Sequence, residues 1–329
     1  MTREKWLIKP GETRVIDLDD IRKLKAGLIG GQIDIVGHDE PGVRIEVHSV
    51  TIQDLRIEAS DDTVEIDHPQ LRWDNFLQVF RNFGSGGPKA EISVAVPRGI
   101  ALTLGVVSAS ALVSGLVSGA RLNTVSGDII VDGMQGDVTA NAVSGDVQIR
   151  GLDGTLSANS VSGAVAAIGA VRKASVDTVS GDIMVDSAGR VDAIGLNTVS
   201  GESTVRLDED LPANYVLRSV SGRLLVDGVT RSGSGPSNWV ASVGELSGSF
   251  VDLRANSVSG AITVLRRSAA VPSGASDEAV DAAASAPAVD PAPAESVSAE
   301  PGPGVESAQP WQTQPEQSET DPTDPAREA

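Results

Sequence analysis

The 329-residue chain contains no cysteine, and only 3% of its residues are aromatic. Without cysteine it can form neither disulfide bonds nor thiolate metal sites. With so few aromatic side chains we expect a narrow structure in which valine, isoleucine and alanine fill the core between neighbouring units. The apolar runs are all interrupted by glycine, serine or charge, and none has the length of a membrane-spanning helix.

Basic residues are also scarce, with 26 Lys and Arg against 45 Asp and Glu and a formal net charge of −19. Such an acidic chain is poorly suited to nucleic acid, so we expect no nucleic-acid partner. The first 20 residues lack the apolar stretch of a secretory signal peptide. The expected location is therefore the cytoplasm by default, with association with the cell envelope as the alternative.

A six-residue phrase centred on Val-Ser-Gly, such as Asn123-Thr-Val-Ser-Gly-Asp, recurs seven times between residues 123 and 261. The first four copies are 18 residues apart, and the next two steps are 20 and 21 residues. The serines of the seven copies are Ser126, Ser144, Ser162, Ser180, Ser200, Ser221 and Ser259. An internal period near 20 residues predicts stacked units, each of which buries its apolar side on its neighbours.

Alternating side chains define a short strand at each copy. The valine before the serine, the glycine after it and the apolar residues three and five positions after it share parity, so we expect them on one buried face. A weaker apolar set follows half a coil later, as at Met134 and Leu152. Connections this short cannot contain a crossover helix. The expected fold is all-β, a parallel β-helix or β-solenoid of about 18–21-residue coils.

Asparagine and glycine mark the expected corners of the coils. Asparagine tolerates left-handed backbone angles, and its amide can bond to the same residue one coil away. The glycine after each serine permits a bend or a close backbone approach. The residues that we assign to this structural framework are Asn123, Val125, Gly127, Asn141, Val143, Gly145, Asn159, Val161, Gly163, Val179, Gly181, Asn197, Val199 and Gly201.

Three regions follow from these patterns. Residues 1–105 predict an antiparallel, β-rich N-terminal lead-in or cap, and residues 106–265 form the β-solenoid repeat array. Residues 266–329 contain ten of the 17 prolines and are rich in alanine, serine and acidic residues. Such a composition buries too little apolar area to offset chain entropy, so we expect a disordered tail.

Four aromatic residues recur at helical spacing within residues 71–83, namely Trp73, Phe76, Phe80 and Phe83. We favour a helix that caps the open end of the solenoid, where unpaired strand edges need cover. The alternative is an interaction site that docks on a membrane surface or a partner protein.

The repeated Asn-Thr-Val-Ser-Gly-Asp phrase, after a β-rich lead that ends at Val96-Pro97, resembles the bacterial β-strand-repeat family labelled "putative adhesin", a domain family of unknown function. The resemblance spans roughly residues 13–265. It implies a β-solenoid behind a short β lead-in, and some relatives are surface proteins tied to envelope stress. It supplies no catalytic residues.

No pattern in the sequence indicates catalysis, a cofactor or a metal site. The acidic row at Asp128, Asp146, Asp182 and Glu202 favours a solvated charge row over a calcium site, because the chain lacks the calcium-binding β-roll motif. The repeat array contains no histidine that could activate its serines.

These observations predict a non-enzymatic binding or scaffold module for an unknown protein or surface ligand. Two alternatives stay open. One is a polysaccharide-active β-helix enzyme, and the other is a regulatory protein that binds its partner through the acidic tail.

Overall fold

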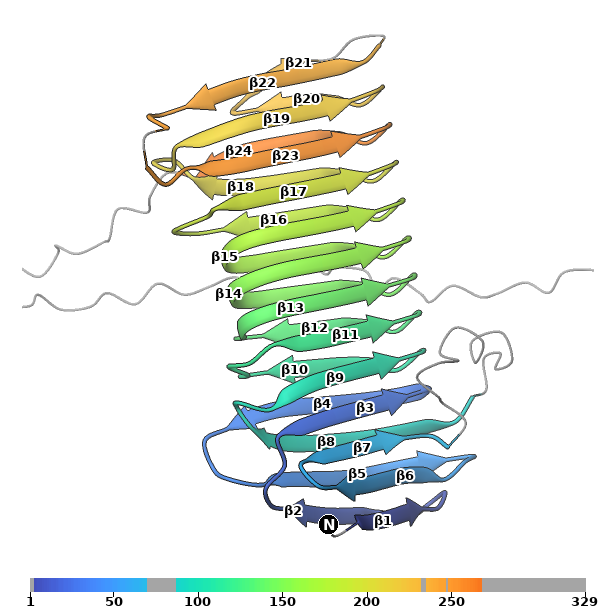
Figure 1. Ribbon diagram of the computed structural model, residues 1–329. Coiled ribbons are helices and arrows are strands. Elements are labelled where there is room, and N and C mark those ends of the chain that lie inside the picture. Colours follow the sequence, from blue (N-terminus) through green and yellow to red (C-terminus); the bar gives the residue numbers. More distant parts are fainter. Residues whose placement is uncertain (1–2, 70–86, 232–234, 247, 268–329) are drawn as a thin grey trace, which may run out of the picture. The chain divides into compact units, whose positions relative to one another are not determined.

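The computed structural model describes residues 3–69, 87–231, 235–246 and 248–267, and every regular element in these residues is a β-strand. The strands pair into one 24-stranded sheet that winds into a stack of coils (Figure 1). The strands are β1 (Arg3–Ile8), β2 (Arg14–Leu18), β3 (Lys23–Leu28), β4 (Gly30–His38), β5 (Val43–Thr51), β6 (Leu55–Ser60), β7 (Thr63–Asp67), β8 (Lys89–Pro97), β9 (Ala101–Val106), β10 (Ser110–Ser114), β11 (Ala120–Thr124), β12 (Ile129–Asp132), β13 (Gln135–Ala142), β14 (Val147–Ser160), β15 (Val165–Thr178), β16 (Ile183–Ser187), β17 (Ala193–Thr198), β18 (Ser203–Asp208), β19 (Ala213–Ser219), β20 (Leu224–Val226), β21 (Val229–Arg231), β22 (Ser237–Val243), β23 (Val251–Ser257) and β24 (Ile262–Arg267).

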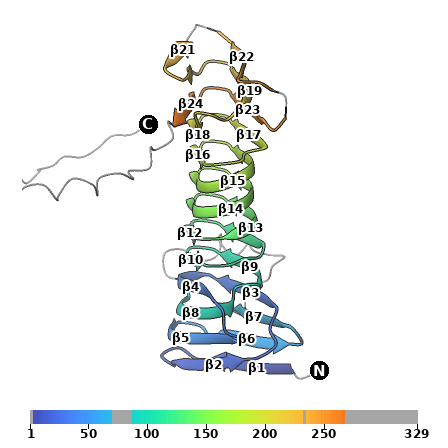
Figure 2. The same cartoon turned by 90° about the vertical axis from the view of Figure 1, so that its left-hand side faces the viewer.

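Each central coil contributes one extended stretch to each of two facing layers, which Figure 2 shows from the side, and β14 and β15 run through both layers. β11 pairs in parallel with β13, and β12 pairs in parallel with β14. Equivalent residues of successive coils are direct partners, as Leu122 is with Ala140 and Val131 with Ile149. The expected all-β, solenoid-like class is confirmed.

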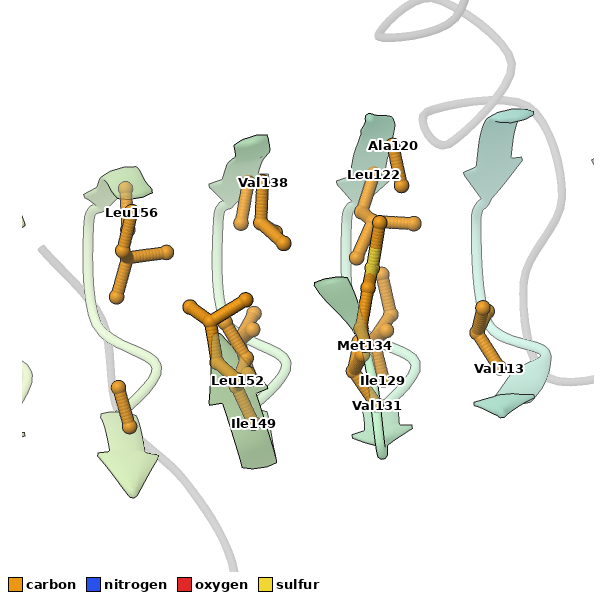
Figure 3. Close-up of a cluster of buried hydrophobic side chains, with 14 of the residues drawn as sticks. Val113, Ala120, Leu122, Ile129, Val131, Met134, Val138, Ile149, Leu152 and Leu156 are labelled. Carbon is orange, nitrogen blue, oxygen red and sulfur yellow. The ribbon is translucent and has the colours of Figure 1, made fainter. Parts of the chain in front are cut away.

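The core is the narrow space between the two layers. Figure 3 shows Leu122, Val138 and Leu156 of one layer facing Ile129 and Ile149 of the other. All five side chains are buried. The prediction that the residues three and five positions after each serine point inward is therefore confirmed. Aliphatic side chains fill this space well, which accounts for the scarcity of aromatic residues.

The order of coils at the C-terminal end differs from the order in the sequence. β19 does not pair with β17, the preceding strand of the same layer. It pairs instead with β23. β23 and β24 pair in parallel with β17 and β18 on one side and with β19 and β20 on the other. The last coil of the chain is thus inserted between two earlier coils. β21 and β22 then pair antiparallel with β20 and β19 and close this end.

The N-terminal end has a similar exchange. β3 pairs in parallel with both β7 and β9, and β4 with both β8 and β10. The expected antiparallel arrangement holds only for the outer strands, where β5 and β6 run against β8 and β7, and β2 and β1 run against β5 and β6. Because Ile29 alone separates β3 from β4, the chain passes directly from one layer to the other there and forms no hairpin. The stacked coils therefore continue across residues 105 and 106.

Candidate functional site

The Val-Ser-Gly phrase forms the corner where the chain passes between the layers. β11 ends at Thr124, and β12 begins at Ile129. A Cβ atom on Gly145 would collide with the carbonyl oxygen of Gly127 in the preceding coil. The same collision with the neighbouring coil occurs at Gly163, Gly181, Gly201, Gly222 and Gly260. The expected close backbone approach at these glycines is confirmed.

The corner serines bind the neighbouring coil through their hydroxyl groups. Ser126 Oγ donates to the carbonyl oxygen of Val107 at 3.0 Å, and Ser144 Oγ donates to that of Val125 at 3.0 Å. Equivalent bonds are formed by Ser180, Ser200, Ser221 and Ser259. These hydroxyl groups are therefore structural donors that hold one corner to the next.

The asparagines three positions before the serines form a hydrogen-bonded column, which we call the asparagine column. Asn141 Nδ2 donates to Asn123 Oδ1 at 3.0 Å, Asn159 Nδ2 to Asn141 Oδ1 at 3.1 Å, and Asn256 Nδ2 to Asn197 Oδ1 at 2.8 Å. The predicted bond between coils is confirmed. The predicted left-handed backbone is wrong, because these asparagines lie inside extended strands and the corner begins after them.

The carboxylates of the acidic row accept hydrogen bonds from the backbone. Asp128 Oδ1 accepts the N–H of Asp146 at 3.0 Å, Asp146 Oδ1 that of Ala164 at 2.8 Å, and Asp182 Oδ1 that of Glu202 at 2.8 Å. Each carboxylate therefore satisfies a corner amide of the next coil. Within the described residues, no three His, Asp or Glu side chains gather in a group that could hold a metal ion.

Most of the corner valines face solvent. Val161, Val179 and Val199 are 46–49% exposed, so the predicted buried column is wrong at these positions. The strand ends before the valine, and the preceding residue, such as Thr178, is the one that points inward. Thr178 Oγ1 donates to the Gly181 carbonyl oxygen across the corner at 2.8 Å.

The corner valines differ along the stack. Val125 is buried in a small cluster with Ile29 and Val107, and Val143 packs against that cluster. Beyond them, five valines are about half exposed at the same corner of successive coils. We call this row the valine ridge, and in stack order it consists of Val161, Val179, Val199, Val258 and Val220.

A hollow of about 480 Å³ lies at the C-terminal end of the valine ridge. Val220, Val258 and Pro236 supply its apolar wall, and Arg218 and Asn256 line it on the side of the asparagine column. Strand alternation does not predict this hollow, because β23 meets β19 only through the exchanged order of coils. The available signal was Arg218, which stands where most copies of the repeat have asparagine.

The predicted interaction residues Trp73, Phe76, Phe80 and Phe83 lie outside the described residues, as does the acidic tail. The capping helix, the docking site and the disordered tail therefore stay predictions. At the C-terminal end, β22 covers the core with Trp239. Trp239 is buried there, with the Arg231 guanidinium 4.2 Å from the centre of its ring.

Comparison with protein-family models matches residues 32–265 to the Toastrack DUF4097 family. The chain belongs to this family. The Toastrack match spans the central parallel coils and the exchanged coil at the C-terminal end, and it agrees with the resemblance to adhesin-labelled repeat proteins. None of the curated proteins compared with the chain matches it.

Several solved structures are similar to this Toastrack chain. A protein titled putative adhesin from Parabacteroides distasonis is 13% identical and covers 78% of this chain and 99% of its own, with a TM-score of 0.42. A putative adhesin from Bacteroides fragilis is 11% identical and covers 78% and 100%, with a TM-score of 0.38. A putative lipid binding protein from Parabacteroides distasonis is 14% identical and covers 79% and 98%, with a TM-score of 0.37. In the part of the Toastrack chain that the structure describes, no helix is long and apolar enough to cross a membrane.

Proposed function

We propose that the chain is a non-catalytic binding module, in which a parallel β-helix scaffold presents the valine ridge to an elongated partner. The observation that carries this proposal is the row of half-exposed valines at one corner of five successive coils. Stacked strands place equivalent side chains about 4.8 Å apart. A contiguous apolar row that stays accessible is typical of an interaction surface.

The polar residues beside the ridge support a binding role over a catalytic one. The serine hydroxyls are engaged by carbonyl oxygens, and the acidic side chains accept backbone N–H groups. A nucleophile needs a neighbouring base, and a glycosidase needs two carboxyl groups that flank a cleft. In the repeat these groups instead form hydrogen bonds between successive coils. The partner that we expect is a protein or surface ligand of the cell envelope.

The test compares binding of the full chain and a ridge variant to isolated bacterial envelope fragments by co-sedimentation. The ridge variant combines Val161→Ser, Val179→Ser and Val199→Ser. Removing three half-exposed apolar contacts should lower the affinity about tenfold or more. The control combines Ile130→Ser and Ile168→Ser, which are also exposed but lie outside the ridge.

The control variant should bind like the wild type, and all three proteins should have similar melting temperatures. Equal binding by the ridge variant would remove the ridge as the binding surface. Failure of the wild type to bind the fragments would remove the envelope partner.

A further inference from the structure

The C-terminal coils form a basic end on an acidic protein. Residues 211–267 contain six arginines and no lysine, against three acidic residues. The preceding coils, residues 121–210, contain 13 acidic residues against six basic ones. An anion that approaches the stack is therefore repelled along most of the array and attracted at this end.

Within this end, Arg218 interrupts the asparagine column at the hollow. It is the direct partner of Asn256 in β23 and of Asn238 in β22. Asn256 Nδ2 donates to Asn197 Oδ1, but the next residue in the column is Arg218, so the column supplies no amide from the described residues to Asn256 Oδ1. No carboxylate among the described residues pairs with the Arg218 guanidinium, whereas Arg254 pairs with Asp252 at 2.9 Å.

The opposite wall of the hollow is apolar. Val220 and Val258 are about half exposed, and Pro236 lies beside them. The wall continues along the valine ridge to Val199, which lies in the coil next to that of Val258. A volume of about 480 Å³ is within the range of small-molecule sites, roughly 300–1,000 Å³.

We propose that this hollow binds a small anionic amphiphile, with its carboxylate or phosphate on Arg218 and its apolar chain against Val220 and Val258. A guanidinium forms charge-assisted hydrogen bonds with either anion, so the two head groups share one recognition chemistry. Asn238, the other direct partner of Arg218, also lines the hollow, and its amide can donate a further hydrogen bond. This inference goes beyond the proposed function, since it concerns a small ligand at one end of the stack.

The test is isothermal titration calorimetry of the full chain with decanoate and with decyl phosphate. Acetate and inorganic phosphate alone measure the contribution of the head group, and decyltrimethylammonium has the same chain with the opposite charge. Decanoate or decyl phosphate should bind at least about tenfold more tightly than either the free anion or the cationic amphiphile. The better of the two identifies the head group.

Arg218→Gln should weaken this binding about tenfold, and Arg218→Lys should retain part of it. Arg254→Gln is the matched control, because Arg254 lies on β23 close to the hollow and does not line it. Melting curves show whether each variant is folded. Three results would each overturn the proposal. The wild type and Arg218→Gln could bind the anionic amphiphiles equally well, or the wild type could bind decyltrimethylammonium as tightly as it binds them. The third is that the wild type binds neither decanoate nor decyl phosphate. None of these outcomes depends on the envelope partner of the valine ridge.

Discussion

The guanidinium of Arg267 lies 2.8 Å from Asp186 Oδ1, across 81 residues of sequence. Arg267 also contacts Asp208 at 2.7 Å, and Arg206 holds the second oxygen of Asp186 at 3.1 Å. Asp186 is buried. This cluster joins β24 to β18, its direct neighbour, and to β16 one coil further on, so it holds the last coil of the chain against the preceding coils on one side.

Arg267→Gln should therefore loosen the inserted coil. Removing one partner of a buried carboxylate leaves part of its charge uncompensated, and we expect a loss of about 1–3 kcal/mol in the free energy of unfolding. Urea unfolding measures this loss, and hydrogen exchange should show faster exchange in β23 and β24. Arg254→Gln removes an exposed pair and should cost less than about 0.5 kcal/mol. Equal unfolding midpoints for the two variants would contradict the clamping role of Arg267.

Buried His68 should make stability depend on pH. Burial lowers the pKa of His68 from 6.5 to about 4, and among the described residues neither ring nitrogen has a hydrogen-bond partner. Between these values the unfolded chain binds a proton that the folded chain does not. The contribution of neutral His68 to the free energy of unfolding is therefore fully present above pH 6.5. It is lost as the pH falls towards 4, by about 3 kcal/mol in total.

Urea midpoints at several pH values between 4 and 7.5 measure this dependence. In His68→Leu the free energy of unfolding should fall much less at low pH. His48→Gln, at an exposed position, should show the same fall as the wild type. An unchanged pH slope in His68→Leu would assign the effect to other groups.

Gly163 should not tolerate a side chain. Its Cβ atom would collide with the carbonyl oxygen of Gly145, and backbone rather than a flexible side chain would have to move. We expect Gly163→Ala to cost about 3 kcal/mol or more, which is the upper range for overpacking. Gly99→Ala is the control, since a Cβ atom there meets nothing within 4 Å. Thermal melts followed by circular dichroism compare the two, and equal melting temperatures would show that the corners can separate cheaply.

Val161 and Val165 should respond differently to the same substitution. Val161 is 47% exposed, so Val161→Asp should change the free energy of unfolding by less than about 1 kcal/mol. Val165 is 1% exposed, and Val165→Asp would bury an unpaired carboxylate between the layers and should unfold the array. Soluble yield and circular dichroism distinguish these outcomes. If Val161→Asp lowered the stability of the fold by much more than this, the Val161 side chain would have to be packed and not exposed.

Much of the fold was predictable because strand alternation is a local property. The inward positions of Ile129 and Val131 follow from the alternation within β12. The alternation failed at the corners. There the chain changes layers, so the alternation that places Val165 inside does not extend back to Val161, which is exposed.

The candidate site was less accessible from sequence. The hollow at Arg218 requires β22 and β23 to lie on either side of β19, and these strands are separated from it by different lengths of chain. No motif marks the hollow, because each of its walls is an ordinary part of a repeat.

By itself, the sequence determined the period, the all-β coil and the glycine contacts, since these arise within one repeat and between identical repeats. Only the tertiary structure decided which coil lies on which. Every coil presents nearly the same apolar rows and backbone groups at its edges, so local pattern cannot distinguish one neighbour from another. That choice depends on contacts between distant residues, such as Arg267 with Asp186, whose energy exists only once the coils have met.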